Sequence, residues 1–188
     1  MVKPQEIEPN GYYANLLSRR LIVRQGWDNT IAEALVERSL EPEIVERYAR
    51  DNRKRFTNLE KANTWFANNQ PLTMYTLALA RTAELAGVIW IAPPEEKIPE
   101  AERAFNMRMY ETVRGRGLAI DFGMVALFDY ERQNPDYEGD LGVNVNRDYR
   151  DEIRVLEALD FHKREKHRTN EFITMVRPGL RSRFAGVK

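Results

Sequence analysis

Hydrophobic residues recur at every second position in several stretches of the chain, and this spacing is typical of β-strands with one buried face. In the first part of the chain the pattern predicts strands over residues 20–24, 74–80, 84–92 and 101–109. Beyond residue 140 it predicts strands over residues 141–145, 162–166 and 171–177. Residues 81–83 have the length of a hairpin loop, and Gly87 in the following strand predicts a bulge or a close backbone approach. We therefore expect the strands between residues 74 and 109 to pair antiparallel in sequence.

Apolar residues at helical spacing predict helices between and after these strands. Thr30–Glu33 and Thr57–Glu60 are capping-box patterns, so each predicts a helix start. A helix that begins at Pro42 is expected to end at the charged run of residues 50–55, which we interpret as a solvated surface. Two later helices are predicted over residues 118–130 and 153–159.

The length of the chain indicates one domain with one core. With 188 residues, of which 43% are hydrophobic, the chain is long enough for one well-packed domain and too short for two. Residues 1–14 contain Pro4, Pro9 and Gly11 and show little periodicity, so they are expected to form an irregular arm. The single domain is expected over residues 15–180, followed by a basic tail at residues 181–188.

Charge and residue types exclude several classes of partner and chemistry. The 29 basic and 29 acidic residues cancel, so no global field attracts nucleic acid or an anionic membrane. The absence of cysteine excludes disulfides, thiolate metal sites and a cysteine nucleophile. No metal site is predicted, because neither His162 nor His167 lies in a metal-binding motif. No apolar run reaches the roughly 18–20 residues of a membrane span, and a cytoplasmic location is expected.

The segment Arg114–Ala119, called the glycine turn below, joins a predicted strand to a mostly buried helix. Gly115 and Gly117 allow close approach of the backbone to a ligand, and the first N–H groups of a helix have no intrahelical partner. Such a turn can bind an anion. A P-loop would need Lys and Ser or Thr after its last glycine, and this turn continues with Leu and Ala. A dinucleotide fingerprint would need a small residue at Ile120, and an ordinary glycine-rich turn remains a further alternative.

Arg114, Gly117 and Ala119 also fill the pattern Arg/Gln-x-x-Gly-x-Gly/Ala after an antiparallel strand. This pattern resembles the pyrophosphate-binding motif of the GNAT superfamily, the acyl-CoA-dependent N-acetyltransferases. Ser18–Arg24 and Arg154–Phe161 are similar to two segments of the branch that contains ribosomal-protein N-terminal acetyltransferases and spermidine acetyltransferases. The resemblance implies the GNAT fold, an α/β (α+β) architecture with a mixed, mostly antiparallel central sheet flanked by helices.

The resemblance further implies acetyl-CoA as the cofactor, CoA as its product, and no metal. Backbone N–H groups of the glycine turn are expected to bind the pyrophosphate, helped by its two arginines. The free edge of the preceding strand is expected to pair with the amides of the pantetheine arm, as in strand addition. The expected cofactor-binding residues are Met107, Met109, Arg114, Gly115, Arg116, Gly117, Leu118 and Ala119.

The same resemblance implies direct attack of a primary amine on the acetyl group, with less guidance on proton transfer. Glu102 is the first candidate for the general base, and a water chain ordered by Asn146 or Tyr149 is the second. Leu156 stands where many family members carry a tyrosine thought to protonate the leaving thiolate. Asp160, directly after the helix that contains Leu156, replaces a glycine of the family, so the end of this helix must adopt a different geometry.

The acceptor follows from the free energy needed to deprotonate an amine. A lysine-type amine requires about 4–5 kcal/mol at pH 7, whereas an α-amine requires only about 1 kcal/mol. We therefore expect an α-amine on a small molecule or a peptide. The resemblance implies an acceptor groove near Glu95 and Gln133. Two alternatives remain open: an acyltransferase that uses another acyl-CoA, and a CoA-binding sensor without catalytic activity.

Overall fold

The strands form one mixed sheet in a computed structural model that describes residues 5–6, 11–164 and 171–179. The sheet has eight strands in the order β1-β2-β3-β4-β5-β6-β8-β7. The strands are β1 Gln5–Glu6, β2 Leu21–Gln25, β3 Thr73–Leu79, β4 Leu85–Ala92, β5 Arg103–Met109, β6 Leu141–Asn146, β7 His162–Lys163 and β8 Phe172–Arg177. Among the described strands only β5 and β6 pair parallel, so the sheet is mostly antiparallel, as predicted.

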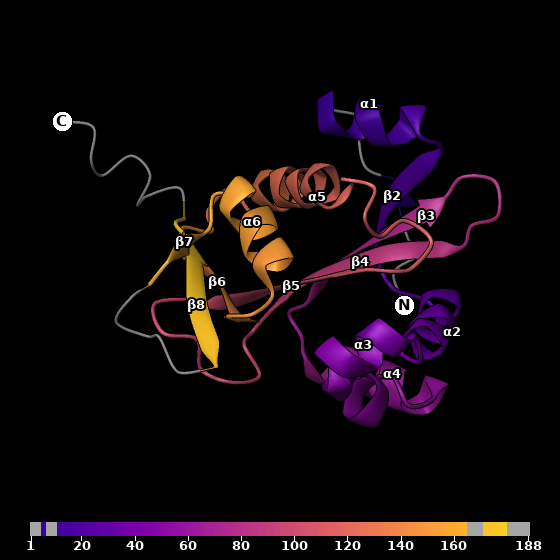
Figure 1. The fold of residues 1–188 in the computed structure, drawn as a ribbon, viewed down its shortest axis with the longest axis horizontal. Helices are drawn as coiled ribbons and strands as arrows, with labels where there is room; N and C mark the ends of the chain where they lie inside the picture. The colour runs from indigo at the N-terminus through magenta and orange to yellow at the C-terminus, as the bar shows by residue number, and fades with distance from the viewer. Residues whose placement is uncertain (1–4, 7–10, 165–170, 180–188) are drawn as a thin grey trace.

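Helices cover both faces of the sheet (Figure 1). They are α1 Gly11–Ser18, α2 Asn29–Arg38, α3 Pro42–Arg47, the short π-helix η1 Asp51–Arg55, α4 Leu59–Asn68, α5 Ala119–Gln133 and α6 Arg150–Ala158. In Figure 1, α1, α5 and α6 lie above the sheet, and α2, α3 and α4 lie below it. Two hydrophobic cores result, one on each face.

The residues of β3 and β4 alternate between these two cores. Tyr75 and Ile89 pack in the core with α5 and α6, whereas Met74 and Trp90 pack in the core with α2 and α4. Every residue of β4 is buried, because helices cover both of its faces. The register between β3 and β4 shifts after Leu77, opposite Gly87, which confirms the predicted bulge.

The N-terminal arm contains more structure than predicted. Residues 11–14 belong to α1, so the prediction of an irregular segment was wrong there. Tyr13 and Leu16 are the buried residues of α1, and their spacing of three places them on the same side of the helix. The predicted tail at residues 181–188 lies outside the described residues.

Both predicted helices form, but neither of the predicted threonines is the N-cap residue. The N-cap of α2 is Asp28, whose carboxylate accepts a hydrogen bond from the Ile31 N–H at 2.9 Å. The N-cap of α4 is Asn58, whose side-chain oxygen accepts from the Lys61 N–H at 2.9 Å. Asp and Asn are at least as good as Thr at this position, so Asp28, two residues before Thr30, and Asn58, the residue after Thr57, cap the helices.

The charged run of residues 50–55 is not simply a solvated surface. It forms η1, and within it the Asp51 side chain is only 2% exposed. Asp51 pairs with Arg55 at 2.7 Å and with Arg108 of β5 at 2.9 Å. The prediction was wrong because Arg108, the partner that buries this carboxylate, is 57 residues away in sequence.

α6 ends in a left-handed residue although no glycine is present there. Asp160 itself adopts the left-handed conformation, with φ of 68°. The Phe161 N–H donates to the Leu156 carbonyl at 3.0 Å, which closes the helix as a Schellman motif does. Aspartate is one of the few non-glycine residues that tolerate this conformation.

None of the described helices combines the length and the apolar character that a membrane span requires.

Candidate functional site: a cleft between two diverging strands

The candidate site lies where β5 and β6 separate. These strands pair only through Arg103 with Leu141 and Ala104 with Gly142, and they diverge beyond these pairs. A cleft of about 360 Å³ occupies the gap. Its walls come from α3 and the residue after it, β5, the glycine turn, β6 and the first turns of α6. The divergence of β5 and β6 after two residue pairs therefore leaves an opening inside the sheet.

Backbone carbonyls of β5 face this opening. The Met107 carbonyl accepts a hydrogen bond from the Arg108 side chain at 2.9 Å. The Met109 carbonyl accepts two from Arg114, at 3.1 and 3.0 Å. Carbonyls two residues apart in a strand point to the same edge, and both of these are reached by side chains rather than by a neighbouring strand. Met107 and Met109 both line the cleft, as expected for an edge that pairs with an extended ligand.

The glycine turn forms the end of the cleft next to α5. Gly115 and Gly117 have φ values of 73° and 71°, which L-amino acids with a side chain rarely adopt. A Cβ added at either glycine would meet no atom within 4 Å, so the space above the backbone is free. The N-cap of α5 is Leu118, which has no side-chain acceptor for the first-turn N–H groups. Free space beside uncapped N–H groups suits a pyrophosphate, and the residues therefore fit the implied cofactor.

The two arginines of the glycine turn differ in their surroundings. Arg114 lines the cleft and pairs with Glu41 at 3.1 Å and with Glu43 at 2.6 Å. Arg116 is exposed, and its carbonyl accepts a hydrogen bond from Arg19 at 3.3 Å. The charge of Arg114 is thus already shared with two carboxylates, which reduces what it can contribute to an anionic ligand.

We expect Arg114→Ala to weaken CoA binding only about tenfold, or about 1.4 kcal/mol. The backbone of the turn remains in place, and the lost cation was already paired with Glu41 and Glu43. Isothermal titration calorimetry with CoA measures the effect, and Arg81→Ala, at an exposed position between β3 and β4, serves as the control. A loss of more than about 100-fold in folded protein would show that the side chain, not the backbone, dominates the site.

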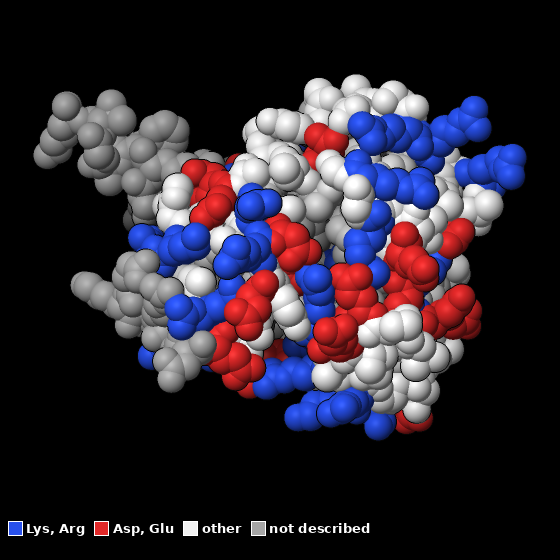
Figure 2. Space-filling model, in the orientation of Figure 1, with Lys and Arg blue, Asp and Glu red and all other residues white. Residues whose placement is uncertain are grey.

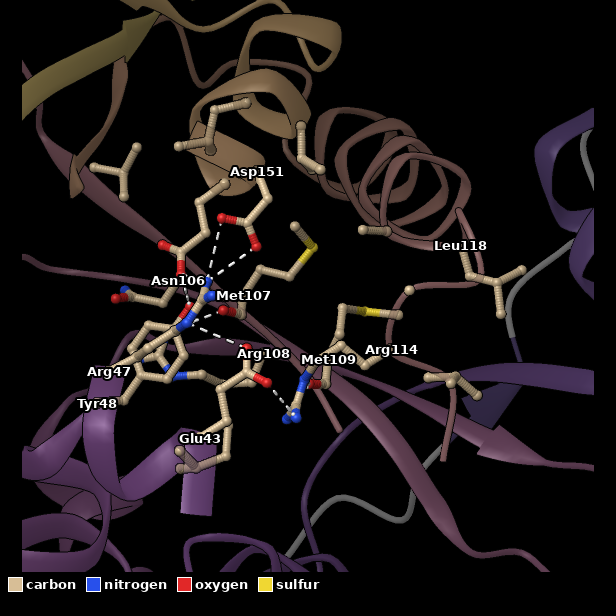
Figure 3. Close-up of a pocket in the computed structure, with 18 of the residues that line it drawn as sticks. Glu43, Arg47, Tyr48, Asn106, Met107, Arg108, Met109, Arg114, Leu118 and Asp151 are labelled. Carbon is tan, nitrogen blue, oxygen red and sulfur yellow. Dashed lines mark hydrogen bonds and ion pairs between the residues drawn. The ribbon is translucent and has the colours of Figure 1, made fainter. Parts of the chain in front are cut away.

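A row of paired charges crosses the cleft (Figure 3). Arg47 of α3 pairs with Asp151 at 3.0 Å and with Glu152 at 3.3 Å, both on α6. The Arg47 guanidinium also lies 4.6 Å from the centre of the Tyr149 ring. In Figure 2, basic and acidic side chains are interspersed over the middle of this face. The ion pairs therefore connect the helices below the sheet with α6 above it.

Arg108 and Tyr48 lie beneath this row. The Arg108 guanidinium lies 3.5 Å from the centre of the Tyr48 ring, and the Tyr48 hydroxyl donates a hydrogen bond to the Glu152 carboxylate. Burial raises the pKa of the Tyr48 phenol well above its ordinary value, Glu152 adds to the rise, and Arg108 opposes it. Tyr48 consequently stays protonated throughout the physiological pH range.

A second, smaller pocket of about 120 Å³ lies next to the cleft. Phe105, Asn106, Val143 and Asn144 line both cavities, so the two meet where the strands diverge. Glu95 lines the smaller pocket and accepts two hydrogen bonds from Arg55, each of 2.9 Å. Although burial alone would raise the pKa of Glu95, hydrogen bonds from Arg55 and Trp65 lower it below its ordinary value.

The two residues expected near the acceptor groove lie in different places. Glu95 lines the second pocket. Gln133, at the end of α5, instead exchanges a hydrogen bond of 2.8 Å with Gln25 of β2 and lines neither cavity. The structure therefore does not bring these two residues together.

The predicted proton-transfer residues lie outside the cleft lining. Glu102 is exposed at the start of β5, where its carboxylate lies against Gly139. The Asn146 side chain accepts a hydrogen bond from the Asp148 N–H at 2.9 Å and so shapes the turn after β6. Tyr149 is the N-cap residue of α6 and contacts the cleft through Arg47. Leu156 does line the cleft and is buried.

Sequence reasoning missed the charged and hydroxyl groups of the cleft. These are Glu43, Arg47, Tyr48, Arg108, Asp151 and Glu152. Arg108 alternates with the apolar residues of β5, and a strand covered on both faces buries that position as well. Glu152 lies one turn before Leu156, so the helical spacing placed it on the cleft side. The pairing of Tyr48 with α6 left no local signal, because 104 residues separate the partners.

Several solved structures with a similar fold are acetyltransferases. The chain is similar to AAC(6')-Ib in complex with paromomycin and acetyl-CoA, at 18% identity and a TM-score of 0.64, over 88% of this chain and 97% of that one. It is similar to RimL, a ribosomal-protein α-N-acetyltransferase with CoA, at 17% identity and a TM-score of 0.64, over 85% and 94%. The chain has the GNAT acetyltransferase fold.

A third solved structure with a similar fold contains a polyamine. Spermidine N-acetyltransferase from Vibrio cholerae, in complex with CoA and spermine, is 13% identical with a TM-score of 0.63, over 84% of this chain and 95% of that one. No protein-family model and no curated protein sequence matches the chain. The predicted fold is thus confirmed, whereas identities below one fifth do not select a branch within the GNAT fold.

Proposed function

We propose that this protein transfers an acetyl group from acetyl-CoA to a primary amine. The observation that carries the proposal is the cleft between β5 and β6, which ends at an uncapped helix start with two left-handed glycines. Structures with this fold have been solved with acetyl-CoA or CoA bound. The combination supports an acyl-CoA site more specifically than a glycine-rich turn alone.

Two backbone segments would bind different parts of acetyl-CoA. Backbone N–H groups at Gly117, Leu118 and Ala119 would hold the pyrophosphate, and the free edge of β5 at Met107 and Met109 would orient the pantetheine arm. Acetyl-CoA supplies an activated thioester carbonyl when it is bound. Val143 and Asn144, on the opposite strand, line both cavities and so border the space where an acceptor from the second pocket would meet that carbonyl.

The preferred acceptor in this proposal is an α-amine on a peptide or a small molecule. Deprotonation of an α-amine at neutral pH requires about 1 kcal/mol, against about 4–5 kcal/mol for a lysine-type amine. Glu102, the first candidate for the general base, is exposed and outside the cleft. If Glu102 does not deprotonate the amine, the acceptor that requires less free energy for deprotonation, the α-amine, is favoured.

We expect turnover with α-amines to rise through pH 7–8, as the amine loses its proton, and Glu102→Gln to change it less than about tenfold. The measurement is release of free CoA thiol with a panel that holds a free-N-terminal peptide, its N-acetylated counterpart with a lysine, spermidine and paromomycin. Polyamines or lysine side chains far ahead of every α-amine would contradict the acceptor assignment. Binding of CoA without turnover of any amine would favour a sensor, and turnover only with longer acyl-CoA would change the donor.

A further inference from the structure

From the contacts inside the cleft we infer that Glu152 and Tyr48 form a proton-transfer pair, with Glu152 accepting a proton from the attacking amine and Tyr48 donating one to the leaving sulfur. This inference rests on the proposed function, since it assigns the proton transfers that acetyl transfer from acetyl-CoA requires. It assigns them to two residues that no sequence motif singled out.

The composition of the cleft lining restricts the choice of groups. Among the described residues that line the cleft, Tyr48 is the one with a hydroxyl group, and there is no histidine. Three carboxylates, Glu43, Asp151 and Glu152, lie there with it. Leu156, one turn after Glu152 on α6, has an aliphatic side chain without a proton to exchange. The phenol and one of these carboxylates are thus the groups available for proton transfer.

Glu152 is the carboxylate in contact with the phenol. It accepts the hydrogen bond from the Tyr48 hydroxyl, and its side chain keeps 24% of its surface exposed. Glu43 is engaged by Arg47 and Arg114, and Asp151 is 67% exposed at the mouth of the cleft. Only Glu152, of the three, offers a direct route between a carboxylate oxygen and a hydroxyl inside the cleft.

Two arginines hold the pair in place. Arg47 lies 3.3 Å from a Glu152 oxygen and also pairs with Glu43 and Asp151. Arg108 stacks on the Tyr48 ring and pairs with Asp51 from η1. Arg47 thus holds the Glu152 carboxylate and Arg108 holds the Tyr48 ring, which keeps the two side chains against each other in the cleft.

The proton transfers close without any further reactant. As the N–C bond forms and the C–S bond breaks, Glu152 takes the proton that the nitrogen releases, and Tyr48 passes its own proton to the sulfur. Glu152 then returns its proton to the Tyr48 oxygen along their hydrogen bond. The pair ends in its starting state, with one proton moved from nitrogen to sulfur. The hydrogen bond between the two side chains provides the path for this last transfer, so no group outside the pair is needed.

The first test compares Tyr48→Phe and Glu152→Gln in steady-state kinetics with acetyl-CoA and a free-N-terminal peptide. Each is expected to lower kcat about 100-fold, the usual range for a general acid or base, with KM for acetyl-CoA changed less than about threefold. The double variant should be no slower than the slower single variant, because the pair acts as a unit. Glu157→Gln, on the same helix but paired with Lys163 at 2.7 Å outside the cleft, is the matched control. Multiplicative losses, or kcat within threefold of the wild type, would overturn the inference.

The second test needs no acceptor amine. The thiolate of bound CoA absorbs in the ultraviolet, so its pKa can be titrated in the complex. A hydroxyl that donates to the sulfur stabilises the thiolate, and Tyr48→Phe should raise the pKa of the bound thiol by about one unit. The exposed Tyr12→Phe should leave it unchanged. An unchanged thiol pKa in Tyr48→Phe would overturn the pair even if acetyl transfer is established. Wild-type protein that binds CoA but acetylates no amine would overturn the proposed function and, with it, the pair.

Discussion

Gly117→Val is expected to abolish CoA binding in a protein that remains folded. Gly117 has φ of 71°, and the position of a Cβ there is open space at the end of the cleft. A β-branched side chain would occupy the place where the pyrophosphate meets the backbone N–H groups, and would strain the turn as well. Calorimetric titration with CoA should give at least a 100-fold weaker affinity.

Two further variants separate strain from obstruction. Asn tolerates the left-handed conformation, so Gly117→Asn should melt close to the wild type and still lose CoA binding. Gly11→Val, at the start of α1, also adds its Cβ to open space but has no left-handed backbone and should bind CoA normally. Normal CoA affinity in folded Gly117→Val would remove the glycine turn from the cofactor site.

Asp51→Ala is expected to cost about 3–5 kcal/mol of folding free energy, the usual effect of removing one partner from a buried ion pair. The Arg108 side chain, 9% exposed, would lose its carboxylate partner, and Arg55 would keep only Glu95. For a domain of this size the loss corresponds to a melting temperature lower by about 6–20 °C.

Thermal and urea unfolding measure this loss. Asp136→Ala, at an exposed position of the loop after α5, is the matched control and should change the free energy of unfolding by less than about 0.5 kcal/mol. A loss below about 1 kcal/mol for Asp51→Ala would mean that water or a shifted side chain replaces the carboxylate. In that case Arg108 would not need Asp51 to hold its place against Tyr48.

Strands and helices were predictable from the sequence because their periodicity is local. The strands at Thr73–Leu79 and Leu85–Ala92 lie within one residue of their predicted bounds at each end, since both are short apolar runs and turn residues lie between them. Helix caps were less accurate, because Asp28 and Asn58 compete with the neighbouring threonines for the same role. The glycine turn was found because its glycines and its position between strand and helix are local features.

The chemistry inside the cleft was not predictable in the same way. Tyr48 and Glu152 meet only because α3 and α6 face each other across β5, and neither residue lies in a distinctive pattern. Glu102 was chosen because it precedes the strand that leads to the turn, but a strand carries its first residues away from its last ones. β5 is seven residues long and lines the cleft only from Phe105 to Met109, so Glu102 lies before the lining begins.

The parallel pairing of β5 and β6 also determines how stiff the sheet is. Two residue pairs join these strands, whereas six join β4 to β5 and six join β6 to β8. Relative movement of the block β1–β5 against the block β6–β8–β7 therefore breaks fewer backbone hydrogen bonds than movement at either neighbouring junction. Of these three junctions, the one between β5 and β6 has the fewest paired residues. A ligand that forms hydrogen bonds to the edges of both β5 and β6 would add connections across this junction and restrict the relative movement of the two blocks.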